Sequence, residues 1–90
     1  MKLFILENCP HCRRARQWIK ELCEENPLYK EIPIELIDEA KESQLADSYD
    51  YFYVPCFYDN DIKLHEGVAS KDIIRDIFEN YLRRNGKWIF

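Results

Sequence analysis

The sequence predicts a small α/β domain in which a mixed four-stranded sheet has helices on both faces. Short runs rich in Ile, Leu, Phe and Tyr alternate with segments whose apolar residues recur at steps of three and four, the helical period. The resulting order is β-α-β-α-β-β-α. Two strands joined through a helix are expected to run parallel, and the last two strands to form an antiparallel hairpin. Ninety residues, 47% of them apolar, are expected to form a single domain over residues 1–90.

The first strand and the first helix lie in the N-terminal quarter of the chain. Residues 2–6 are nearly continuous in apolar side chains, as a buried central strand would be. A helix is expected from Pro10 to about Glu25, because Pro10 suits the first helical turn and Asn26-Pro27 ends the helix. The residues expected on its inner face are Cys12, Ala15, Trp18, Ile19, Leu22 and Cys23.

The middle of the chain predicts a second strand and a second helix. Residues 32–37 are rich in Ile and Leu and indicate the strand. Asp38 is expected to cap a helix that runs to about Tyr49, because an aspartate side chain can accept an N–H of the first helical turn. The inner face of this helix is sparse and consists of Ala40, Leu45, Ala46 and Tyr49.

A hairpin and a final helix complete the predicted fold. Residues 53–58 and 62–66 are strand-like, and residues 59–61 form a turn cluster between them. Ser70 is expected to cap a last helix that ends at Asn85-Gly86. Its apolar stripe is Ile73, Ile74, Ile77, Phe78, Tyr81 and Leu82. For the apolar tail at residues 87–90, the sequence does not choose between packing on the domain and docking against a neighbour.

The chemistry-bearing feature of the chain is Cys9-Pro10-His11-Cys12, between the first strand and the first helix. The unpaired N–H groups and the dipole of a helix N-terminus stabilise a thiolate and lower its pKa. Cys9 is therefore the expected attacking thiol, and Cys12, in the first turn on the buried side, is the expected resolving thiol. His11 lies between them, and its side chain or partial charge is expected to lower the Cys9 pKa further, with Arg13 and Arg14 adding positive potential.

Other interpretations of the cysteines carry less support. A zinc site needs four ligands, and no second Cys-x-x-Cys or His pair follows, so we expect no metal; Cys56 and His65 could complete a site only by a coincidence of folding. A secreted disulfide framework is disfavoured by the absence of a signal-like N-terminus and by the ample apolar core. Cys23 and Cys56 are expected to fill the core, with a third redox thiol as the alternative for Cys56.

The composition argues against several classes of partner. The formal net charge is −4 and no basic run exceeds two residues, which disfavours nucleic acid. No apolar segment approaches the length of a membrane span. We therefore expect no nucleic-acid or membrane partner, a cytoplasmic location and a monomer.

Taken together, several motifs make the chain resemble the thioredoxin superfamily. They are the Cys-Pro-x-Cys after a first strand, Arg14-Ala15 beyond it, Val54-Pro55 before a strand, and a Gly followed by a Ser-capped last helix. The short length and early motif are similar to glutaredoxins in particular. The resemblance implies the thioredoxin fold and a cis Val54–Pro55 bond beside the dithiol, with Tyr53, Val54 and Pro55 binding an extended substrate. Aromatic residues crowd the approach to Pro55, some as a possible substrate rim and most as packing: Tyr49, Tyr51, Phe52, Tyr53, Phe57 and Tyr58.

The sequence also departs from that family at positions that matter for chemistry. Glutaredoxins commonly place Lys or Arg three residues before the first Cys, to bind a glutathione carboxylate; this chain has Leu6, followed by Glu7. The segment at residues 67–72 looks more like thioredoxin. Thioredoxin in turn usually has a buried Asp where this chain has Leu3, so proton transfer is expected to differ, through water or Glu7.

The sequence therefore predicts a thiol–disulfide oxidoreductase with a role in cell redox homeostasis and electron transport. Its Cys9–Cys12 dithiol would exchange with protein disulfides or glutathione mixed disulfides. No permanently bound cofactor is expected, and glutathione as co-substrate and a dedicated reductase as partner stay open. The alternatives are a thioredoxin-like reductant independent of glutathione, a metal or iron–sulfur carrier, and a redox-regulated binding module.

Overall fold

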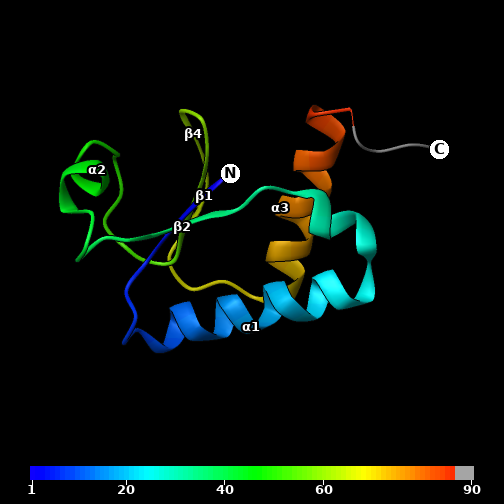
Figure 1. Cartoon of the computed structure of the whole chain (residues 1–90), viewed down its shortest axis with the longest axis horizontal. Coiled ribbons are helices and arrows are strands. Elements are labelled where there is room, and N and C mark those ends of the chain that lie inside the picture. Colours follow the sequence, from blue (N-terminus) through cyan, green and yellow to red (C-terminus); the bar gives the residue numbers. More distant parts are fainter. Residues whose placement is uncertain (87–90) are drawn as a thin grey trace.

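A computed structural model describes residues 1–86 of the chain, and the predicted apolar tail at residues 87–90 lies outside the described residues. Figure 1 shows the arrangement of the elements. They occur in the predicted order, with one additional 3₁₀-helix, η1, after the first helix. Their bounds are β1 Lys2–Ile5, α1 Pro10–Glu25, η1 Pro27–Glu31, β2 Glu35–Asp38, α2 Ser43–Asp47, β3 Cys56–Asp59, β4 Ile62–Glu66 and α3 Lys71–Arg84.

The four strands form one mixed sheet in the spatial order β2-β1-β3-β4. β1 and β2 are parallel and are connected through α1, with Leu3 opposite Leu36. β3 is antiparallel to β1, and β4 is antiparallel to β3. Asn60, in the turn of this hairpin, adopts a left-handed φ of 54°, which asparagine tolerates better than most residues. The predicted sheet class and strand directions are confirmed.

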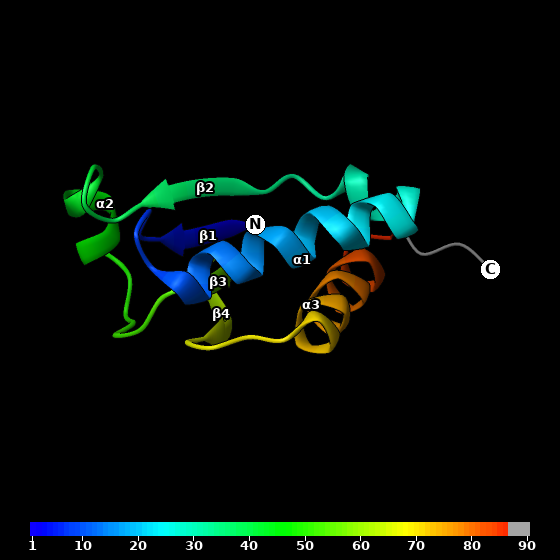
Figure 2. The ribbon, with the colours of Figure 1, turned by 90° about the horizontal axis from the view of Figure 1, so that it is seen from below.

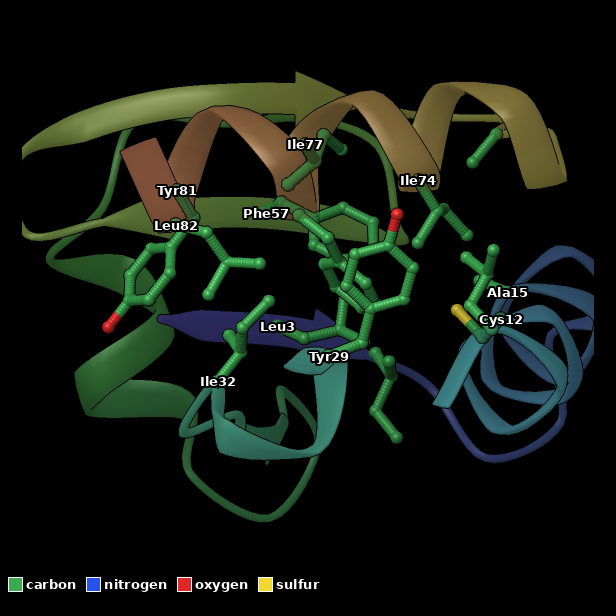
Figure 3. Packing of buried hydrophobic residues seen from close by; sticks show 14 residues of the cluster. Leu3, Cys12, Ala15, Tyr29, Ile32, Phe57, Ile74, Ile77, Tyr81 and Leu82 are labelled. Atoms are coloured by element: carbon green, nitrogen blue, oxygen red, sulfur yellow. The ribbon is translucent and has the colours of Figure 1, made fainter. Parts of the chain in front are cut away.

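The two faces of the sheet are covered by different elements, because successive residues of a strand point to opposite faces. Leu3 and Ile5 of β1 belong to a buried cluster with residues of α1, η1 and α3. Figure 2 shows that α1 and α3 lie side by side. Figure 3 shows side chains of both helices packing toward β1 and β3. Phe4 faces the opposite side and packs with Ile37 and with Ala46 of α2. Helices therefore lie on both faces, as predicted.

The prediction is wrong about the segment before β2. The strand begins at Glu35 rather than Ile32, because the preceding residues have other hydrogen bonds. The N–H of Ile32 donates to the carbonyl of Tyr29 and closes η1, while Pro33 has no N–H to donate. The carbonyl of Pro33 accepts a hydrogen bond from the N-terminal ammonium of Met1. The first strand is also one residue shorter than expected and leaves Leu6 exposed.

The predicted helix after Asp38 is much shorter in the structure. The carboxylate of Asp38 accepts the N–H of Ala40 at 2.9 Å, and its carbonyl accepts the N–H of Glu42, so the chain makes a local turn first. α2 then occupies only Ser43–Asp47. Aspartate at such a position favours a turn as readily as a helix cap, and a sparse apolar face gives the longer helix little to pack.

The hairpin and the last helix agree better with the prediction. β3 begins at Cys56 rather than Tyr53, because Pro55 has no N–H for the ladder. The hydroxyl of Ser70 accepts the N–H of Ile73 and caps α3, as predicted. Ile73, expected on the inner stripe, is exposed instead. None of the helices in residues 1–86 has the length and apolar character needed to span a membrane.

Candidate active site

Cys9 is the N-cap residue of α1, at the junction with β1. Its backbone is extended, its N–H donates to the carbonyl of Leu6 at 3.2 Å, and its carbonyl accepts the N–H of Arg13 at 3.1 Å. Pro10 follows as the first helical residue and has no N–H to leave unpaired. The Cys9 side chain is half-buried, so its sulfur is reachable at the end of a helix, where anions are stabilised.

The surroundings of Cys9 favour its thiolate. Burial raises the pKa of Cys9, but interactions with the backbone N–H and thiol of Cys12, the backbone N–H of His11 and the charge of Arg13 together lower that pKa below its ordinary value. No N–H of residues 1–86 makes a capping hydrogen bond of standard geometry with the Cys9 sulfur, so the stabilisation of the thiolate is spread over several groups. His11 acts through its backbone, and its side chain is exposed.

Cys12 has the opposite environment, one turn into the same helix. Its side chain is 1% exposed, and Figure 3 shows it with Ala15 at the edge of the buried cluster. Burial, together with the neighbouring Cys9 and the charge of Glu39, raises the pKa of Cys12 to about 11. At neutral pH, Cys12 is therefore a protonated thiol beside a more acidic one. The two thiols of the motif therefore differ in both exposure and acidity.

Glu39 is a member of this site that the sequence analysis missed. It follows β2, and its N–H donates to the carbonyl of Ile5, the residue at the end of β1. Burial and then the charges of Asp38 and Asp47 raise the pKa of Glu39. No local motif marks this residue, because only the parallel pairing of β1 with β2 brings it near the dithiol.

The peptide bond between Val54 and Pro55 is cis, as the family resemblance implied. Pro55 is buried, and Val54 packs against the same buried cluster as Cys9. The carbonyl of Pro55 accepts the N–H of Gly67 at 2.9 Å. Neither the N–H nor the carbonyl of Val54 has a hydrogen-bond partner within residues 1–86, so both groups are free to pair with an extended peptide.

The residues before Pro55 are attached to the hairpin by Glu66, which the sequence analysis also missed. Its carboxylate accepts the backbone N–H groups of Phe52 at 2.6 Å and of Tyr53 at 3.0 Å. The same carboxylate pairs with Lys63 at 2.7 Å, and these hydrogen bonds, the Lys63 one foremost, lower the pKa of Glu66 to about 2. Phe52 and Tyr53 remain 86% and 70% exposed, unlike the other aromatic residues of this region.

Most of the crowded aromatic residues are packing residues, as expected. The rings of Tyr49 and Tyr51 lie 4.9 Å from that of Phe4, centroid to centroid, on the α2 side of the sheet. Tyr58 packs edge-on against Phe4 and Tyr49 and donates its hydroxyl to the carbonyl of Asp50 at 2.6 Å. Of these six aromatic residues, only Phe52 and Tyr53 are exposed.

A pocket of ≈ 420 Å³ opens beside Cys9. Its cation is Lys41, whose ammonium lies 3.2 Å from the carboxylate of Glu7. Lys41 comes from the turn after β2. It supplies the positive charge of this pocket, whereas Leu6 is apolar. The lining residues are Leu6, Glu7, Asn8, Cys9, Asp38, Ala40 and Lys41.

The two other cysteines belong to the packing of the domain. Cys56 is fully buried, and burial, with a smaller contribution from Glu66, raises its pKa to about 12. Cys23 is half-buried, and burial raises its pKa as well. All four cysteines are free thiols. Within residues 1–86, no three His, Cys, Asp or Glu side chains are grouped so that they could bind a metal ion.

No protein-family model matches the chain, and no curated protein matches it. The assignment of function therefore depends on the geometry and chemistry of the site.

Proposed function

We propose that this chain is a thiol–disulfide oxidoreductase with a thioredoxin fold, similar to glutaredoxins, and that its Cys9–Cys12 dithiol reduces disulfides. The single observation that carries the proposal is the asymmetry of the pair. Cys9 is partly exposed at a helix N-terminus with a lowered pKa, whereas Cys12 is buried with a pKa of about 11. Such an arrangement suits a nucleophile followed by a resolving thiol.

The proposed fold is supported by the topology. A parallel β1-α1-β2 unit is followed by the antiparallel β3-β4 hairpin and by α3, in one sheet of order β2-β1-β3-β4. The dithiol follows β1, and the cis Val54–Pro55 bond precedes β3, the other strand beside β1. This order is the one that the resemblance implied for the thioredoxin superfamily.

The proposed reaction has two exchange steps. The thiolate of Cys9 attacks one sulfur of a substrate disulfide, forms a mixed disulfide and releases the other substrate sulfur as a thiolate, which takes up a proton. Cys12 then loses its proton and attacks the Cys9 sulfur, which forms the Cys9–Cys12 disulfide and releases the second substrate thiol. The substrate disulfide gains two electrons, and the dithiol loses them.

Protein disulfides are the better-supported substrate. Val54 offers a free N–H and carbonyl to an extended chain, and the exposed Phe52 and Tyr53 add apolar surface beside it. Glutathione, with two carboxylates, would meet Lys41 in the pocket beside Cys9, but Glu7 and Asp38 line the same pocket and Glu7 already pairs with Lys41. Glutathione mixed disulfides are therefore a second substrate class that we expect to be used less efficiently.

Substitution of each thiol tests the proposal. With insulin as a protein disulfide, Cys9→Ser should abolish reduction, and Cys12→Ser should accumulate a mixed disulfide that mass spectrometry detects at Cys9. Cys23→Ser serves as the control, because Cys23 lies outside the site. Equal residual activity in Cys9→Ser and Cys12→Ser would refute the assigned roles. A parallel assay with glutathione or with a thioredoxin reductase as the electron source would then rank the two enzyme classes.

A further inference from the structure

A basic face on α1 has no partner in the described part of the chain. Arg13, Arg16 and Lys20, spaced by three and four residues, are exposed on one side of the helix, and none of them has a carboxylate within 4.0 Å among residues 1–86. Arg14 is also exposed and unpaired among these residues, but it lies on another side of the helix. Most other Lys and Arg side chains of these residues form ion pairs: Lys2, Lys41, Lys63, Lys71, Arg75, Arg83 and Arg84. Unpaired cations grouped on one helix are unexpected in a chain with a formal net charge of −4.

An apolar groove lies directly beside these cations, between α1 and the edge strand β2. Its pocket of ≈ 210 Å³ is lined by Ile19, Ile34 and Leu36, with Arg16 and Lys20 at its rim. Leu36 is 45% exposed although it occupies the same face of the sheet as its buried partner Leu3. Among the described residues, α1 therefore covers β1 but leaves Leu36 of β2 partly exposed. Figure 2 shows β2 at the edge of the sheet, beyond β1.

The groove and the cations form one continuous surface. A second depression, lined by Arg13, Arg16, Gln17 and Lys20, shares Arg16 and Lys20 with the apolar pocket. At 1.5 Å per residue, the surface extends about 10 Å along α1 from Arg13, the residue next to Cys12. Glu35, the carboxylate adjacent to Leu36 in sequence, is paired with Lys2 at 3.7 Å and leaves the groove cations unopposed.

We propose that this surface binds an acidic, apolar segment of a partner protein. The apolar side chain of the segment would enter the pocket formed by Ile19, Ile34 and Leu36, and its Asp or Glu residues would pair with Arg16 and Lys20. Within residues 1–86, the outer edge of β2 has no strand beside it, so an extended segment can also pair with its backbone. The binding does not depend on the proposed thiol chemistry, although its position next to the dithiol would bring a partner near Cys9.

The chemistry of the surface favours a protein segment over other anionic partners. A pocket of ≈ 210 Å³ is smaller than the roughly 300–1,000 Å³ typical of small-molecule sites, but an aliphatic side chain can enter it. A nucleic acid has a negative charge on every nucleotide and no aliphatic side chain to contact the exposed Leu36, so the net negative charge opposes it more strongly than a short peptide with a few carboxylates. A peptide that combines carboxylates with leucine satisfies both parts of the surface.

A binding measurement with a cysteine-free peptide tests this inference separately from the redox function. The probe is a fluorescein-labelled 12-residue peptide of Glu, Asp and Leu, compared with one in which Lys replaces the acidic residues and with a 12-nucleotide single-stranded DNA. We expect the acidic peptide to bind the full chain, with amide shifts in α1 and β2 by NMR. Arg16→Glu/Lys20→Glu should raise the Kd at least about fivefold, since two ion pairs become repulsive. Leu36→Asp should weaken binding similarly.

Lys30→Glu is the matched control, because Lys30 is an exposed, unpaired cation of η1 outside the groove. It should change the Kd much less than Arg16→Glu alone. Absence of binding at millimolar peptide, equal losses from Lys30→Glu and Arg16→Glu, or no effect of Leu36→Asp would overturn the proposal. Tighter binding of the DNA than of the acidic peptide would overturn it as well, in favour of a nucleic-acid surface.

Discussion

The carboxylate of Glu66, at the end of β4, accepts the backbone N–H of Phe52 at 2.6 Å. The same oxygen accepts the N–H of Tyr53, so one side chain fixes the two residues that precede Val54. Both aromatic side chains are exposed to solvent, while their backbone N–H groups are held by Glu66. Glu66 thus links the hairpin to the segment that we propose to bind substrate.

Glu66→Ala should release this segment. We expect a lower Tm and a higher KM for a protein disulfide, because two backbone N–H groups lose their acceptor while the dithiol is untouched. Lys63→Met is the control, because it removes only the ion pair and leaves both backbone hydrogen bonds in place. Glu66→Gln keeps an acceptor oxygen and should lie between the two. An unchanged KM in Glu66→Ala would show that the hydrogen bonds from Phe52 and Tyr53 to Glu66 have no role in substrate binding.

The ionisation of Glu66 gives a stability change at acid pH. Its pKa falls from an ordinary 4.5 to about 2, chiefly through the hydrogen bond from Lys63. A carboxyl group with a lowered folded-state pKa stabilises the fold above its unfolded pKa and loses that contribution as the pH falls. The wild type should therefore lose stability relative to Glu66→Gln between about pH 4.5 and pH 2, as measured by urea unfolding. Parallel curves for the two proteins over this range would contradict the assignment.

Alkylation rates should distinguish the two thiols of the dithiol. The pKa of Cys9 is lowered, so its rate with iodoacetamide should reach half of its maximum below the ordinary thiol value of 9.0. Cys12, with a pKa of about 11, has only about one thiolate per ten thousand molecules at pH 7. Peptide mapping by mass spectrometry should therefore find the label on Cys9. A half-maximal pH at or above 9.0, or faster labelling of Cys12, would invalidate the argument from the helix N-terminus.

Cys56 should be inert in the folded protein despite its position next to Pro55. Its side chain is fully buried and its pKa is about 12, so a thiol reagent should reach it only after unfolding. Cys56→Ala should retain disulfide reductase activity. Cys56→Ser should cost about 1–3 kcal/mol of stability, because it buries a hydroxyl without a partner. Loss of turnover in a folded Cys56→Ala protein would assign Cys56 a redox role instead.

Most helix ends and the strand directions of this fold could be predicted from the sequence, but the side chains that tertiary contacts bring to the site could not. Pro10, Asn26-Pro27 and Ser70 mark helix ends through their own backbone chemistry, and the structure confirms each of them. The prediction of a helix directly after Asp38 was wrong because aspartate also favours a turn. Only tertiary packing decides between the helix and the turn. In the same way, Cys9 and Cys12 follow from a four-residue motif, whereas Glu39 and Glu66 join the site only through strand pairing and a carboxylate bound to distant backbone groups.

The charge arrangement at the pocket beside Cys9 predicts how glutathione use can be improved. Glu7 lies 3.2 Å from Lys41 and neutralises the cation of this pocket. Glu7→Gln should free Lys41 to pair with a glutathione carboxylate and raise kcat/KM for a glutathione mixed disulfide by about two- to fivefold, as expected for one exposed ion pair. Lys41→Gln should have the opposite effect. Glu42→Gln makes the same change in net charge outside this pocket and should have little effect on kcat/KM. An equal gain from Glu42→Gln would show that the net charge of the protein, and not the release of Lys41, causes the increase.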